Sequence, residues 1–267
     1  MPLNFFTIAS GSSGNSVYVA TENTKILIDA GLSGKTIEQG LGTYGINCRD
    51  INAIFITHEH SDHIKGAGIL SRRYDLPIYA TSGTWSYMSR CSTVGRVAEK
   101  NKLTVKENVP VVLYDMEIKP FEIPHDANQP VGYSILSGRH KAVIATDLGH
   151  ITQVVAENVY GADIMLIESN HDLDMLKNGR YPAVLKRRIL GDRGHLSNVS
   201  CGLFIKDIFS EKTKHILLGH LSQENNLPTI AYETVKDILL AGKIDIGGAV
   251  ELYLAERHRP GVMISLN

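Results

Sequence analysis

The heptapeptide Thr57-His58-Glu59-His60-Ser61-Asp62-His63 carries more chemical information than any other stretch of this 267-residue chain. Four of its side chains are potential metal ligands: His58, His60, Asp62 and His63. Neutral imidazole nitrogen and carboxylate oxygen suit Zn²⁺, Mn²⁺ or Fe²⁺. A histidine-rich surface turn is the alternative interpretation. Four such groups on one loop would be poorly satisfied without a cation, which favours a metal site.

The residues on either side place this heptapeptide between a strand and a helix. Residues 51–56 form an apolar, β-branched run that is typical of a buried strand. Residues 64–74 repeat apolar side chains at helical spacing. The potential ligands would therefore lie at the carboxyl end of a strand and in the first turn of a helix. A rigid scaffold can hold polar groups in a cleft there.

Composition indicates the compartment of the protein and argues against a membrane span, but it excludes few functions. The formal net charge is −1, so any binding of a polyanion must come from a local patch. The start of the chain has no basic segment followed by a long apolar one, and no apolar run approaches the roughly 20 residues of a membrane span. The three cysteines, Cys48, Cys91 and Cys201, are odd in number and widely spaced, as in a reducing compartment. We expect a cytoplasmic protein without membrane association or an obligate protein partner.

The order of the expected elements indicates the class of fold. Residues 3–9, 17–19 and 25–28 read as strands, and the Gly/Ser-rich loop 10–16 is either an anion cradle or a tight hairpin connection. Strands and helices do not alternate as in a doubly wound fold, so we expect two strand-rich halves with helices outside, in one domain over 1–267. The further strands are expected at 76–81, 103–105, 109–114, 118–123, 131–136, 142–145, 164–168, 214–218, 250–254 and 262–266, with 103–145 forming an antiparallel sheet. The further helices are expected at 83–90, 151–160, 175–190, 199–209 after an N-cap at Ser197 or Asn198, and 229–240.

Acidic or histidine side chains recur where these strands end or where a helix begins. They are His125, Asp147, His195 and His220. Chance accounts poorly for this regularity, because only 11 of the 267 residues are histidine. Each could alone be a surface residue. Together with the heptapeptide they predict one polar site assembled from distant parts of the chain.

His-x-His-x-Asp-His after a hydrophobic strand resembles the signature of the metallo-β-lactamase superfamily of binuclear hydrolases. The resemblance implies an α+β fold, an αββα sandwich of two mixed sheets flanked by helices, with a binuclear metal site at one edge. It also implies that Asp29, at the end of a strand, supports the metal loop without being a ligand.

The resemblance assigns ligands residue by residue. One ion would be held by His58, His60 and His125, and the second by Asp62, His63 and His220, with Asp147 bridging the two. A water molecule between two divalent ions loses a proton near neutral pH and becomes the nucleophile. We expect two divalent metal ions, Mn²⁺ or Zn²⁺ foremost and Fe²⁺ as a third candidate. The expected catalytic residues are Asp62 and His195.

Departures from other branches narrow the expected chemistry. The di-iron oxygen-reducing branch has Glu in place of His60, and the secreted β-lactamases commonly have Cys in place of Asp147. The glyoxalase-type thioesterases have a Gly-His-Thr motif that Pro124-His125-Asp126 does not match. The phosphodiesterase branch, which includes tRNA 3′-processing enzymes and nucleases, remains. There a histidine loop such as Gly194-His195-Leu196-Ser197 protonates the leaving group or holds a phosphate oxygen.

Four stretches resemble the bacterial YycJ/WalJ group, and the resemblance covers nearly the whole chain: Ser10-Gly11-Ser12-Ser13-Gly14-Asn15-Ser16, the central His58-Glu59-His60-Ser61-Asp62-His63, Gly194-His195-Leu196-Ser197 and Gly219-His220-Leu221-Ser222. That group is regarded as 5′→3′ DNA exonucleases linked to DNA repair. The resemblance implies a metal-dependent phosphodiesterase with DNA as its substrate. Only 73 positions separate Asp147 from His220, too few for an inserted cap domain, and no tRNA-binding arm is evident. Arg187, Arg188 and Arg193 either grip phosphates or form a solvated face.

Two other functions stay open. The balanced charge is compatible with a phosphodiesterase for small molecules such as cyclic nucleotides or cyclic phosphates. A metal-stabilised regulatory module without turnover is disfavoured, because a structural zinc site is usually closed by four ligands. Glu168 and His171 receive no role from the sequence.

Overall fold

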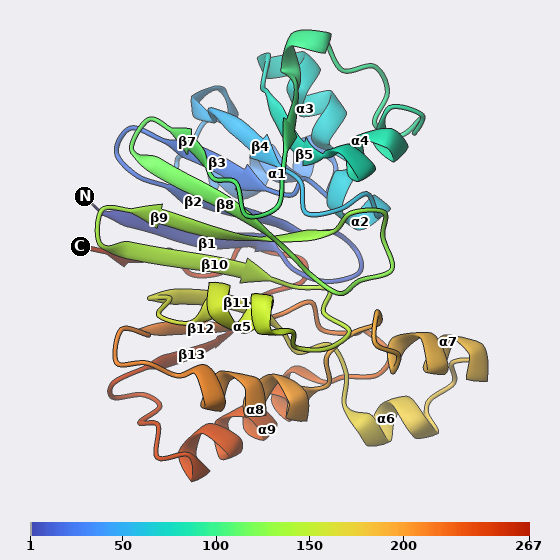
Figure 1. Ribbon diagram of the computed structural model, residues 1–267, viewed down its shortest axis with the longest axis vertical. Helices are drawn as coiled ribbons and strands as arrows, with labels where there is room; N and C mark the ends of the chain where they lie inside the picture. The colour runs from blue at the N-terminus through green and yellow to red at the C-terminus, as the bar shows by residue number, and fades with distance from the viewer. Residues whose placement is uncertain (1) are drawn as a thin grey trace.

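Two seven-stranded sheets pack face to face in the computed structural model, which describes residues 2–267 (Figure 1). Neighbouring strands in the first sheet follow the order β14-β1-β2-β3-β4-β5-β6, and in the second the order β13-β12-β11-β10-β9-β8-β7. The first sheet contains β1 Leu3–Ala9, β2 Ser16–Ala20, β3 Lys25–Ile28, β4 Ala53–Phe55, β5 Ile78–Thr81, β6 Lys102–Val105 and β14 Ile264–Leu266. The second contains β7 Val111–Leu113, β8 Met116–Glu122, β9 Val131–Ser137, β10 His140–Ala145, β11 Ile164–Glu168, β12 His215–Gly219 and β13 Glu251–Leu254.

Each sheet is half antiparallel and half parallel. Strands β14, β1, β2 and β3 pair antiparallel, whereas β3 to β6 pair parallel. In the second sheet β7 to β10 are antiparallel and β10 to β13 parallel. Parallel neighbours need crossover connections, which places helices on the outer faces. The helices are α1 Gly34–Gly42, α2 Ser61–Ile64, α3 Ala67–Tyr74, α4 Ser82–Met88, α5 Gln153–Val159, α6 Leu173–Asn178, α7 Ala183–Ile189, α8 Asn198–Ile208 and α9 Pro228–Ala241.

Apolar side chains fill three layers. Successive residues of a strand point to opposite faces, so Phe5 packs between the two sheets and Phe6 packs under the helices of the first sheet. Phe55 and Tyr133 meet edge to face in the middle layer, at 5.7 Å between ring centroids. Because both faces of each sheet are covered, most strands read as continuous apolar runs. Within residues 2–267, no helix is long and apolar enough to cross a membrane.

The structure confirms the two mixed sheets and the N-cap of α8, where the Ser197 side chain accepts a hydrogen bond from Ser200 N. Three expectations about elements are wrong. Strand β6 pairs parallel with β5 of the first sheet, so residues 103–145 do not form a single antiparallel sheet. The helix expected at 64–74 begins only at Ala67, because the separate short helix α2 ends at Ile64. The helix expected at 175–190 is two helices, α6 and α7, because Pro182 in the connection cannot continue a helix.

Candidate metal centre

The histidine heptapeptide follows β4 and runs into α2, as its flanking sequence predicts. His58 and His63 are fully buried, and His60 is half-buried at the start of α2. Asp29, just after the neighbouring strand β3, braces this loop: its Oδ1 accepts a hydrogen bond from Thr57 N at 2.8 Å. Its Oδ2 accepts one from Thr57 Oγ1 at 2.8 Å and lies 2.7 Å from His63 Nδ1. Asp29 thus orients the ring of His63 through the nitrogen that faces away from the centre.

A first group of potential ligands consists of His58, His60 and His125. His58 Nε2 lies 3.0 Å from His60 Nδ1, which lies 3.3 Å from His125 Nε2. Ligand nitrogens at about 2.0–2.1 Å around a tetrahedral Zn²⁺ stand roughly 3.3 Å apart, so the spacing fits a shared cation. Burial, together with the neighbouring imidazoles, holds the pKa of His58 well below its ordinary value. Burial also lowers the pKa of His125. Both rings are therefore neutral, the form that binds metals.

A second group consists of Asp62, His63 and His220. Asp62 Oδ2 lies 3.5 Å from His63 Nε2 and 3.6 Å from His220 Nε2. Burial opposes ionisation of Asp62, but His63 and His220 outweigh it and hold the pKa of this carboxyl far below its usual range. Burial opposes protonation of His63 and His220, but Asp29 and Asp147 outweigh it and raise the pKa of both rings. Each imidazole would therefore release a proton on binding a cation.

Asp147 faces both groups. Its Oδ2 lies 3.4 Å from His63 Nε2, and its Oδ1 lies 3.7 Å from His125 Nε2. Asp147 Oδ2 and His220 Nε2 are buried and have no hydrogen-bond partner within residues 2–267. Buried polar atoms are normally paired, so these two atoms fit a cation-binding role. The donors gathered here can hold a divalent metal.

The backbone is strained where three of these strands end. Asp29 after β3, Asp147 after β10 and His220 after β12 have φ angles of 61°, 62° and 54°. Left-handed backbone is uncommon for residues other than glycine and clusters at functional sites. The three sharp turns lie at the ends of strands whose side chains meet at one edge of the sandwich.

Glu168 is the site residue that sequence reasoning missed. It ends β11, is fully buried, and its Oε1 lies 2.8 Å from His195 Nδ1 and 2.9 Å from His220 Nδ1. Its Oε2 accepts hydrogen bonds from Leu148 N and Leu196 N. Burial opposes protonation of His195, but Glu168 outweighs it and raises the pKa of this imidazole. The available signal was a carboxylate at the end of a buried strand, the same position that Asp147 occupies.

The Gly/Ser-rich loop proves to be the hairpin connection between antiparallel β1 and β2, and it also supports the centre. Asn15 N donates to Asp62 O, and Asn15 Nδ2 lies 3.3 Å from Asp62 Oδ2. Ser10 Oγ accepts a hydrogen bond from His220 N at 2.9 Å. The loop therefore ties the metal loop of the first sheet to the end of β12 in the second.

Of Arg187, Arg188 and Arg193, the last two make ion-pair or hydrogen-bond contacts with residues next to the metal centre. Arg188 Nε pairs with Asp126, and Arg193 Nε donates to His125 O at 3.0 Å. The Arg187 side chain has no hydrogen bond or ion pair within residues 2–267. None of the cysteines lies in the donor groups.

Fold and donor set together define a metallo-β-lactamase-like hydrolase centre. The family model described as "Beta-lactamase superfamily domain" matches residues 24–216, and the chain belongs to this superfamily. It is accordingly a metal-dependent hydrolase.

Particular relatives cover nearly the whole chain. It is 39% identical over 260 residues to the exodeoxyribonuclease YycJ of Bacillus anthracis, covering 97% of this chain and 98% of that protein. It is 40% identical over 246 residues to the exodeoxyribonuclease WalJ of Streptococcus pneumoniae, covering 92% and 91%. The metallo-beta-lactamase fold protein YhfI of Bacillus subtilis is similar in structure, with a TM-score of 0.73, 16% identity and coverage of 98% and 99%. The short form of human tRNase Z is also similar in structure, with a TM-score of 0.65 and 17% sequence identity, covering 97% of this chain and 98% of that protein. These structural likenesses confirm the fold.

Proposed function

We propose that this protein is a metal-dependent phosphodiesterase that degrades DNA as a 5′→3′ exonuclease. The observation that carries the proposal is the convergence of seven donor side chains from four segments, with His195 from a fifth segment beside them. Similarity to two proteins named exodeoxyribonucleases, at 39% and 40% identity over most of the chain, favours DNA as the substrate.

The two groups described above would hold two divalent ions, with Asp147 between them. Bound there, the ions would supply a water molecule acidified towards neutral pH and positive charge for the phosphate oxygens. Asp62 contributes negative charge beside His63 and His220. Asp29 and Glu168 fix the imidazole rings through their outward nitrogens, which keeps the donor atoms directed inward.

His195 is suited to act as the general acid. Its Nδ1 is held by Glu168 Oε1, so Nε2 is the nitrogen left to reach a substrate. The carboxylate raises the pKa of this imidazole, which favours the protonated ring at neutral pH. A proton delivered from Nε2 to the leaving oxygen would complete cleavage of the phosphodiester.

The test uses metal-analysed protein supplied with Mn²⁺ or Zn²⁺. End-labelled duplex DNA, single-stranded RNA and bis-p-nitrophenyl phosphate serve as substrates, with Asp147→Ala as the inactive control. We expect stepwise shortening of DNA from its 5′ end, absent in the control. Cleavage of the small diester alone would move the substrate to a small phosphorylated molecule. Absence of hydrolysis from all three would support a regulatory module instead.

The role of His195 has a separate test. We expect His195→Ala to lose turnover by about 10²- to 10⁴-fold while keeping its bound metal, because a positioned acid contributes that much. Metal content measured by elemental analysis distinguishes an acid from a ligand. Loss of metal in this variant would contradict the assignment.

A further inference from the structure

A short helical hairpin stands out from the sandwich beside the candidate metal centre (Figure 1). It comprises α6 and α7 with their connection, residues 173–189, and is called the α6–α7 arm below. The arm lies between Glu168, which ends β11, and His195, so its two ends in the chain both lead into the centre. We expected one helix over 175–190 and gave too little weight to Asn178-Gly179 and Pro182, which mark the turn.

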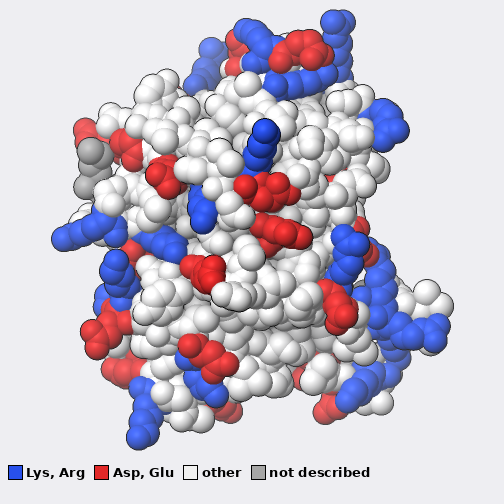
Figure 2. Space-filling view, in the orientation of Figure 1, with Lys and Arg blue, Asp and Glu red and all other residues white. Residues whose placement is uncertain are grey.

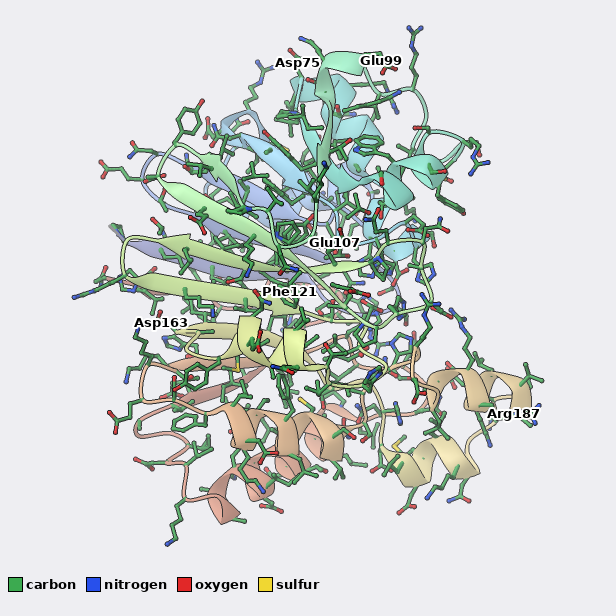
Figure 3. All side chains as sticks on the ribbon, viewed as in Figure 1. Asp75, Glu99, Glu107, Phe121, Asp163 and Arg187 are labelled. Carbon is green, nitrogen blue, oxygen red and sulfur yellow. The ribbon has the colours of Figure 1, made fainter. Side chains whose placement is uncertain are left out.

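The arm carries a charge opposite to that of the rest of the chain. Its 17 residues include five basic side chains and one acidic one, a formal charge of +4, whereas the remainder has 22 basic and 27 acidic side chains. Figure 2 shows Lys and Arg gathered over the region of this arm. Lys177, Arg180 and Arg187 are exposed and make no side-chain hydrogen bond or ion pair within residues 2–267. Figure 3 shows Arg187 at the outer side of α7, away from both sheets. Three cations are thus available to an external anion.

The base of the arm is joined to the centre by direct contacts. Arg188 pairs with Asp126, whose Oδ1 lies 3.4 Å from His125 Nε2 and 4.0 Å from His60 Nε2. The loop after α7 folds back so that His195 N donates to Ile189 O at 2.9 Å. The end of α7 is therefore hydrogen-bonded directly to His195, the candidate general acid.

We propose that the α6–α7 arm binds the phosphodiester backbone of the DNA strand whose end lies in the metal centre. The inference rests on the proposed function and adds the surface that holds a long substrate. Exposed Lys and Arg without acidic partners are suited to phosphates, because binding releases condensed counterions from the strand. Arg188 and Arg193 stay bonded to the protein and hold the base of the arm. A small diester would fill the centre without reaching Lys177, Arg180 or Arg187.

The test compares the triple variant Lys177→Gln, Arg180→Gln and Arg187→Gln with a matched control, Arg49→Gln, Arg96→Gln and Lys212→Gln. Both sets remove one lysine and two arginines that are exposed, so both change net charge equally. The rate of hydrolysis is measured on a 30-nucleotide DNA and on bis-p-nitrophenyl phosphate over a range of salt concentrations. Wild-type protein sets the reference slope of log(kcat/KM) against log salt.

We expect the arm variant to raise KM for the DNA at least about tenfold, and to reduce the salt slope by about 2–3, since each lost phosphate contact removes roughly 0.7–0.9. Hydrolysis of the small diester should match wild type, and the control should change neither quantity. If wild-type protein degrades DNA and the arm variant shows the same salt slope, the proposed role of the arm is wrong and the proposed function stands. Equal losses on both substrates would also overturn the role of the arm, because the substitutions would then act through the centre. Failure of wild-type protein to cleave DNA would overturn the proposed function and the arm together.

Discussion

At the residue scale, Glu168 is the buried carboxylate on which two histidines of the centre depend. It accepts from His195, from His220 and from two backbone amides, so every lone-pair direction of the carboxylate is used. A carboxylate can accept all four of these hydrogen bonds. A side-chain amide would instead point its NH₂ group at one of the N–H donors and leave both unpaired. Glu168 is therefore a positioning residue, acting through the imidazoles it holds.

Glu168→Gln should lower phosphodiesterase activity by about 10- to 100-fold, the usual cost of losing a carboxylate behind a metal-site histidine. The unmatched donors should also lower the free energy of unfolding by about 1–3 kcal/mol. Activity, metal content and urea unfolding are measured together. Glu157→Gln is the control, because Glu157 is exposed on α5 and accepts a hydrogen bond from the exposed Gln153. Wild-type activity in the Glu168 variant would contradict the positioning role.

At the scale of elements, strand ends were predictable and connections were not. Ligand-type residues after apolar runs located His125, Asp147 and His220, because carboxyl ends of strands are where a sandwich presents polar groups. Helical spacing did not reveal the break at Gly66, since apolar residues continue through it, whereas Gly179 and Pro182 marked the second break and were given too little weight. The support from Ser10 was also hidden, because its partner His220 lies 210 positions away. Such contacts follow from packing of the two sheets and have no local signature.

The loop that carries His195 depends on one glycine. Gly194 packs so closely on the end of α7 that a Cβ there would lie 2.2 Å from Ile189 O and 2.3 Å from Arg188 O. Both are backbone atoms, which cannot move aside as the end of a side chain can. The Gly194 carbonyl also lies 3.3 Å from His125 Nδ1, so displacement of the loop disturbs two site residues.

Gly194→Ala should therefore reduce activity by about 10²-fold, as expected for a reacting group misplaced by about 1 Å. Hydrolysis of bis-p-nitrophenyl phosphate measures this separately from DNA binding, because the small diester does not reach Lys177, Arg180 or Arg187. Gly191→Ala is the matched control in the same loop, because its nearest contacts would be 3.2 and 3.4 Å. We expect the control to keep activity within about threefold. Equal activity in the two variants would show that the loop tolerates the added methyl group.

At the scale of the whole molecule, the centre requires both sheets. His58, His60, Asp62 and His63 come from the first sheet, whereas His125, Asp147 and His220 come from the second. Any change in how the sheets pack would separate the two sets. The opposite end of the sandwich, where the β2–β3 and β7–β8 turns meet, holds the sheets together without taking part in chemistry (Figure 1).

Asp115 in the β7–β8 turn joins the two sheets there. Its carboxylate accepts hydrogen bonds from Thr21, Asn23 and Thr24 of the β2–β3 turn. Burial opposes ionisation, but these hydrogen bonds outweigh it and hold the pKa of the carboxyl below its ordinary value. A depressed folded-state pKa gives stability that is present above the unfolded-state pKa of about 3.9 and is lost as pH falls through the folded-state value.

Asp115→Asn should accordingly lower the free energy of unfolding by about 1–2 kcal/mol at pH 7, a range that allows for the partial exposure of Asp115. The difference from wild type should begin to shrink below about pH 4, where the carboxyl of the unfolded chain takes up a proton, and should be lost once the pH falls below the depressed folded-state pKa. Urea unfolding is followed at fixed metal concentration, because bound metal itself stabilises the fold. Asp50→Asn is the control, since Asp50 is exposed and its ion pair to Lys25 spans 3.8 Å. A difference that stays constant between pH 7 and pH 3 would show that Asp115 acts by packing and not by its charge. Hydrolysis of the small diester should stay at the wild-type rate, because the turn lies at the end of the sandwich away from the centre.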